Sequence, residues 1–179
     1  MKKIATIAGI VSAGTAMYLA YKYLFKKSNN NWTMSNSTTT SNGSALPRGY
    51  RNNNPLNIRI SQSNNWLGKV SPNTDGAFEQ FRSMAYGFRA AFVLIRNYVN
   101  NYGATTVQAI ISKWAPNNEN NTQAYISAVC GSTGFSPSTI INPYNETQMC
   151  KLVYAMAIVE NGYAPNMSDV VAGWDLFLK

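Results

Sequence analysis

The sequence contains no histidine, and this absence excludes several kinds of enzyme chemistry. Ser-His-Asp and Cys-His mechanisms need an imidazole base, so neither is available to this chain. Catalytic zinc sites are built largely around histidine ligands, and the sequence has no glycine-rich phosphate-binding loop. We therefore expect no metal and no cofactor. An enzyme with this sequence would have to work with carboxylates, of which there are seven: Asp75, Glu79, Glu119, Glu146, Glu160, Asp169 and Asp175.

Cysteine is also scarce, with only two residues, Cys130 and Cys150. Two cysteines are too few for a disulfide scaffold. They could pair in an oxidising compartment, or they could be small core residues, which is the commoner fate of an unpaired cysteine. We favour the core interpretation.

The net charge of +8 is concentrated near the N-terminus. Five of the fifteen lysine and arginine residues flank the apolar residues 4–21. The rest of the chain contains the other ten together with all seven acids, so its net charge is only +3. This mild excess suits a position beside an anionic polymer but lacks the basic patch of a nucleic-acid-binding protein. No nucleic-acid partner is expected.

Residues 4–21 contain no charged side chain. A helix of this length rises about 27 Å, enough to cross the hydrocarbon core of a membrane. We predict a single transmembrane helix with basic flanks in residues 1–27, and hence a lipid-membrane partner. A cleaved signal peptide and a surface helix are the alternatives; the lysines that follow the apolar run favour the anchor. Positive charge on both sides leaves its orientation open.

Residues 28–47 are rich in Ser, Thr and Asn and predict a flexible linker. Residues 48–179 then predict one globular domain. Its first part contains three short strand-like segments separated by turn residues, which predict a small β-hairpin sheet: residues 57–60, 66–70 and 77–81. From residue 88 onward, apolar residues recur at helical spacing and predict five helices. The predicted class is α+β, mainly α.

Glu160 is the first candidate for an acid. It follows the apolar residues 150–159 and precedes Asn161-Gly162, so its side chain can extend from a helix end into a cleft. Glycoside cleavage needs a protonated carboxyl group, which enzymes obtain in an apolar setting. The alternative is a glutamate simply solvated at a helix end.

Glu119 and Asp75 are further candidates. Glu119 lies in an amide-rich loop near Trp114, which suits sugar recognition by stacking and hydrogen bonding, or else a helix-capping loop. Asp75 is in a turn, Asn-Thr-Asp-Gly, and could be a second carboxylate across the cleft. Glu79 alternates with two phenylalanines expected in the core, so we expect it to face solvent.

A set of short motifs distinguishes the domain: RGYRNNNPLNIR (residues 48–59), NWLG (65–68), FEQF (78–81), AYGFRA (85–90), WAP (114–116) and ENG (160–162). Together they resemble a family of small phage and prophage virion proteins, over residues 48–175. This resemblance implies a virion-associated protein.

The stretch NPLNIR followed by Trp66-Leu67-Gly68 is also similar to flagellar-type glucosaminidases of the lysozyme-like superfamily. Their catalytic glutamate ends a helix just before that stretch, whereas no acid precedes Asn52 here. The helix that ends at Glu160 resembles the missing element, placed at the other end of the domain. The resemblance implies a rearranged lysozyme-like fold in which Glu160 packs against residues 52–59.

The implied function is cleavage of peptidoglycan glycan strands, as a lysozyme or lytic transglycosylase, by a protein anchored in the virion membrane or the bacterial inner membrane with its domain facing the wall. Glu160 would act as acid and then base, and Asp75 or Glu119 would stabilise positive charge. Other virion proteins are further candidate partners. The alternatives are a non-catalytic structural virion protein, a glycan-binding module on a viral membrane, and a host wall-remodelling factor. The residues expected to bind substrate are Asn54, Asn57, Arg59, Trp66, Trp114, Asn120, Tyr125 and Asn161.

Overall fold

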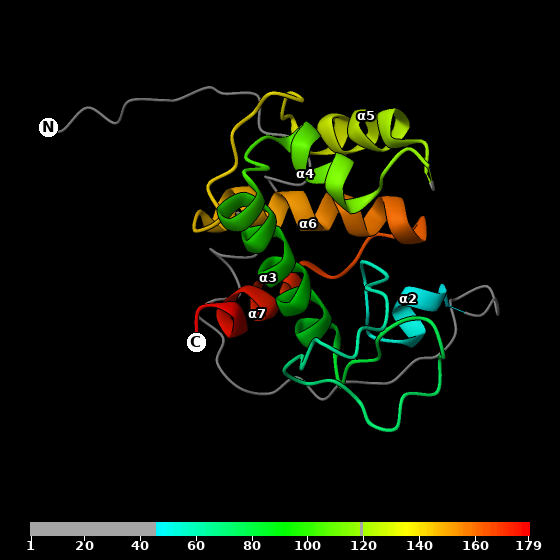
Figure 1. The fold of residues 1–179 in the computed structure, drawn as a ribbon. Helices are drawn as coiled ribbons and strands as arrows, with labels where there is room; N and C mark the ends of the chain where they lie inside the picture. Colours follow the sequence, from blue (N-terminus) through cyan, green and yellow to red (C-terminus); the bar gives the residue numbers. More distant parts are fainter. Residues whose placement is uncertain (1–45, 119) are drawn as a thin grey trace, which may run out of the picture.

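A computed structural model describes residues 46–118 and 120–179, and this part of the chain is helical (Figure 1). Residues 1–27, the predicted anchor, lie outside the described residues, as do Glu119 and most of the predicted linker. Among the helices that are described, none is long and apolar enough to cross a membrane. The helices are α2 (Arg48–Arg51), α3 (Met84–Tyr102), α4 (Val107–Trp114), α5 (Thr122–Thr133), α6 (Glu146–Asn161) and α7 (Met167–Phe177).

The predicted β-hairpin sheet is absent from the described residues. The segment between α2 and α3 contains two isolated antiparallel bridges, Arg59 with Phe78 and Lys69 with Phe81, and no strand. The predicted α+β, lysozyme-like class is therefore wrong for this part of the chain, which is mostly α. The physical reason is that amide side chains take the place of a strand ladder. The buried side chain of Asn54, for example, satisfies three backbone groups: its Nδ2 donates to the carbonyl oxygens of Ile58 and Glu79, at 2.9 Å each, and its Oδ1 accepts from the Ile58 amide.

The helix ends follow local sequence rules. The Asn145 side chain accepts a hydrogen bond from the Gln148 amide at the start of α6, and Thr106 does the same for the Ala109 amide at the start of α4. Gly103 and Gly162 end α3 and α6 in the left-handed conformation, with φ of 66° and 63°. These caps were within reach of sequence reasoning.

Helix α6 is the centre of the core. It contacts α2, α3, α5 and α7, and its residues from Met149 to Ala157 are nearly all buried, Lys151 excepted. Cys150 is among them and Cys130 is half-buried, as the core interpretation predicted. In Figure 1, α4 and α5 lie on one side of α6, and α2 lies beside its C-terminal end.

The most extensive helix pair is α3 with α7, and Gly173 allows their close approach. A Cβ at Gly173 would lie 2.6 Å from the Phe88 Cβ and 2.8 Å from the Ala85 carbonyl oxygen. Both atoms belong to the rigid part of α3, so they cannot move aside cheaply.

We expect Gly173→Ala to lower the free energy of unfolding by about 1–3 kcal/mol, because overpacking outweighs the better helix propensity of alanine. The matched control is Gly131→Ala in α5, where a Cβ would meet no atom within 4 Å. There the change should stabilise by about 0.5–1 kcal/mol. Urea unfolding of both variants measures the difference, and equal effects would contradict the packing argument.

Candidate functional site

The carboxyl group of Glu160 lies at a junction of four segments. Glu160 is in the last turn of α6, and three donors from other segments reach it. Trp114 Nε1 at the end of α4 and the Tyr125 hydroxyl of α5 donate to Oε1, at 3.1 and 3.0 Å. Asn57 Nδ2, from the loop after α2, donates to Oε2 at 3.2 Å.

The contact between Glu160 and Asn57 confirms the expectation that the C-terminal end of α6 packs against residues 52–59, although the fold is not the one that suggested it. The two residues are 103 positions apart in the chain. Their hydrogen bond brings the loop after α2 and the last turn of α6 together.

Asn161 and Gly49 fix the junction. The Asn161 amide donates to the Pro55 carbonyl at 2.7 Å and to the Ala157 carbonyl at 2.9 Å, so it links α6 to the loop. A Cβ at Gly49 in α2 would overlap Asn161 Oδ1 and lie 2.9 Å from Asn57 Oδ1. Only a glycine fits between these two side chains. Sequence reasoning missed Gly49; the Gly-Tyr inside the RGYR motif was the one available signal.

The loop that carries Asn57 has an unusual backbone. Asn57 itself has a φ of 49°, in the left-handed region that asparagine tolerates better than most residues. The buried Asn54 side chain donates to the carbonyls of Ile58 and Glu79 and accepts from the Ile58 amide, so it ties this loop to the segment just before α3. Asn54 thus supports the loop, while Asn57 extends toward Glu160.

Tyr125 is a stable donor to Glu160. Its side chain is buried, and this burial, followed by the charge and the hydrogen bond of Glu160, raises the pKa of its phenol far above the ordinary value. The phenol therefore keeps its proton at any physiological pH. Trp114 and Asn57 also donate without carrying a charge, so the three groups that hold Glu160 are all neutral.

Asp75 occupies a different environment. Arg48 holds both its oxygens, at 2.8 and 2.6 Å, and Asn52 donates to Oδ2 at 2.7 Å. The amides of Ala77 and Phe78 donate to Oδ1 as well. The hydrogen bond from Arg48 is the main cause that holds the pKa of Asp75 well below its usual range. None of its described contacts joins Asp75 to Glu160, and it braces the turn in which it lies.

Glu79 is fully buried, so the expectation that it faces solvent is wrong. Its Oε1 accepts from Lys69 Nζ at 3.0 Å and from the Ser61 amide at 3.2 Å. Burial does alternate over residues 78–81, but Glu79 lies on the buried side with Phe81, whereas Phe78 and Gln80 are only half-buried.

None of the described contacts of the other predicted substrate-binding residues, Asn54, Arg59, Trp66 and Asn120, reaches Glu160. The Arg59 guanidinium lies 5.7 Å from the centre of the Phe78 ring, and Asn120 is exposed in the loop before α5. Trp66 is almost buried and lines a separate pocket. Of the eight residues, the structure brings Asn57, Trp114, Tyr125 and Asn161 to the Glu160 junction. Within the described residues, no cluster of Cys, Asp and Glu could hold a metal ion.

No family model matches the chain. The chain is similar to Protein P5 of Pseudoalteromonas phage PM2, with 36% identity over 126 residues that cover 69% of this chain and 77% of that protein. This match supports the predicted family of phage virion proteins and does not bear on a lysozyme-like domain.

The environment of Asp75 predicts a pH-dependent contribution to stability. Its folded pKa lies below the unfolded value of about 3.9, so its ionised form stabilises the folded state above that pH, and the contribution is lost as the pH falls toward the folded pKa. We expect Asp75→Asn to cost about 1 kcal/mol at pH 7 and progressively less below about pH 4. Thermal unfolding from pH 7 to pH 2 measures this. Asp175→Asn, at an exposed position of α7, is the control; a difference that does not shrink between pH 7 and pH 2 would contradict the ion-pair explanation.

Proposed function

Because the chain belongs to the family of Protein P5 of Pseudoalteromonas phage PM2, we propose that it is a virion-associated phage protein that cleaves peptidoglycan glycan strands, with Glu160 as its acid and base. The observation that carries this proposal is the Glu160 junction. It combines a half-buried carboxyl group with the two aromatic side chains of Trp114 and Tyr125 and the amide of Asn57. Trp114 is partly exposed, and an aromatic face with a neighbouring amide can stack on a sugar ring and bind its hydroxyl and N-acetyl groups; the buried Tyr125 only orients the carboxyl group.

The two carboxyl oxygens of Glu160 differ in their surroundings. Oε1 accepts two hydrogen bonds, from Trp114 and Tyr125, whereas Oε2 accepts one from Asn57 among the described residues. In the proposed reaction Oε1 orients the group, and Oε2 gives its proton to the glycosidic oxygen as the bond to the anomeric carbon breaks. Substrate would replace Asn57 as the partner of Oε2.

The proposed mechanism uses one carboxylate. Hydrolysis with a pair of acids needs a second carboxyl group about 5–10 Å from the first. Of the two residues predicted for this role, Asp75 is the one that the structure describes, and its carboxylate is already bound by Arg48 and Asn52. A single glutamate favours the transglycosylase route. The sugar's own C6 hydroxyl attacks the anomeric carbon, and its proton goes to the carboxylate that has just donated one, so the cycle needs no water nucleophile.

A non-catalytic role as a structural or glycan-binding virion protein is the second candidate. The observation that favours it is that the same hydrogen bonds join α4, α5, α6 and the loop after α2. In that role Glu160 would cross-link the domain and react with nothing. A substitution that changes its chemistry and preserves its shape separates the two candidates.

We expect Glu160→Gln to reduce clearing of purified peptidoglycan at least about 100-fold, because an amide has no acidic proton that it can transfer to the leaving oxygen. Turbidity loss with the full-length chain measures the rate, and analysis of released sugars for anhydro ends identifies the route. Asp75→Asn is the control and should retain most of the activity.

The outcomes are distinct. Clearing by Glu160→Gln at the wild-type rate would exclude Glu160 as the acid. No clearing by folded wild-type protein between pH 4 and pH 8, together with a lower unfolding midpoint for Glu160→Gln, would favour the structural role.

A further inference from the structure

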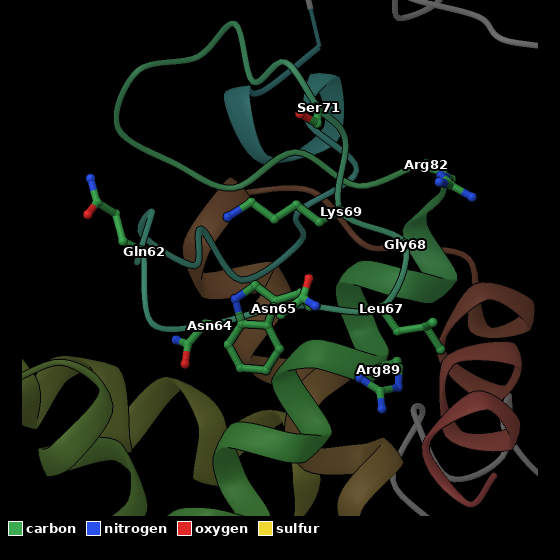
Figure 2. A pocket seen from close by; sticks show the side chains of 10 residues that line it. Gln62, Asn64, Asn65, Leu67, Gly68, Lys69, Ser71, Arg82 and Arg89 are labelled. Atoms are coloured by element: carbon green, nitrogen blue, oxygen red, sulfur yellow. The ribbon is translucent and has the colours of Figure 1, made fainter.

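A second polar pocket lies between the loop of residues 62–71 and the N-terminal part of α3 (Figure 2). Its volume is about 610 Å³, within the range of pockets that hold small ligands or part of a polymer. None of the residues at the Glu160 junction lines it.

The lining of this pocket has charge of one sign. Lys69, Arg82 and Arg89 line it, and no acidic side chain does. The charge of Lys69 is balanced by Glu79, 3.0 Å away. Arg82 and Arg89 form no ion pair with a described acidic residue. Among the described residues, the pocket therefore has two positive charges without an acidic partner, and these favour a negatively charged ligand.

Two hydrogen-bond donors in the lining residues are also unused. Trp66 Nε1 and Arg89 Nε are buried and have no partner among the described residues. A buried donor without an acceptor destabilises the folded protein. Burial, and then the nearby charge of Arg96, lower the pKa of Arg89. A negatively charged acceptor in the pocket could accept a hydrogen bond from Arg89 Nε and would also offset the cost of burying the Arg89 charge near Arg96.

The charged groups lie at opposite sides of the pocket. In Figure 2, Lys69 extends on the side of Gln62 and Asn64, whereas Arg82 and Arg89 lie on the side of Leu67. The amides of Gln62, Asn64 and Asn65 lie in the same lining and can bind the uncharged hydroxyl and amide groups of a longer ligand.

From these observations we infer that the pocket is an accessory subsite for an extended, carboxylate-bearing glycan, with Arg82 and Arg89 at its anionic groups. The choice of peptidoglycan, whose stem peptides carry carboxylates, rests on the proposed function. Binding at this pocket does not require proton transfer by Glu160, so the two proposals can fail separately.

The test is cosedimentation of the full-length chain with purified peptidoglycan sacculi, and with chitin as an uncharged glycan. Every chain carries Glu160→Gln, so that cleavage does not release bound protein. We expect Arg82→Gln with Arg89→Gln to weaken binding to sacculi about tenfold and to leave binding to chitin unchanged. The matched control is Arg51→Gln with Lys179→Gln, which removes the same charge from exposed positions outside the pocket and should preserve binding to sacculi.

Three results would overturn the inference: unchanged binding of the pocket variant to sacculi, an equal loss in the control variant, or an equal loss on chitin. The second would mean that net charge alone attracts the wall polymer. Arg82→Gln alone, at an exposed side chain, serves if the double variant does not fold. An unchanged affinity of that single variant would also count against the subsite. Clearing activity of the parent chain, measured separately, reports only on the Glu160 proposal.

Discussion

The candidate site depends on one contact, in which the C-terminal turn of α6 packs against the loop that follows α2. Asn161 anchors this contact with its 2.7 Å hydrogen bond to the Pro55 carbonyl, and Gly49 leaves just enough space for it. Glu160 and Asn57 meet because their neighbours are held in this way. Helix α6 is also the central core helix, so the position of the carboxyl group is fixed by the packing of the whole domain. A site built on such a rigid element keeps its geometry without relying on a flexible loop.

Asparagine side chains form many of the hydrogen bonds to backbone groups that strand partners in a sheet were expected to form. Asn54 satisfies the backbone groups of Ile58 and Glu79, and Asn53 donates to the Phe81 carbonyl at 3.0 Å. Asn52 connects this loop to Asp75. Each amide offers both donors and an acceptor, so a short run of them can satisfy several backbone groups that have no strand partner. The Asn-rich motif therefore has a structural explanation in three of its members, and only Asn57 extends to the carboxyl group of Glu160.

The sequence allowed the helices to be predicted better than the segment between α2 and α3. Helical periodicity, the Asn145 cap and the terminal glycines depend on neighbouring residues, so these features were within reach. Glu160 could be selected because it ends an apolar helix. Its approach to Asn57 came from the resemblance, since no local pattern encodes a contact between residues 103 positions apart. The burial of Glu79 was missed for the same reason, because its ion pair with Lys69 depends on how the irregular segment folds.

Asp75 and Glu160, the two described carboxylates that were expected to cooperate, differ in the charge of their hydrogen-bond partners. Asp75 is bound by the guanidinium of Arg48, and a cation in contact favours the ionised form of a carboxylate. Glu160 is bound by an indole, a phenol and an amide, which orient it and add no positive charge. A group that must give up and regain a proton during one reaction cycle is better served by neutral donors than by a fixed cation. The uncompensated arginines lie instead in the second pocket, whose lining includes none of the groups that hold Glu160. The proposed proton exchange at Glu160 and the proposed binding of an anionic ligand are thus assigned to separate groups of residues.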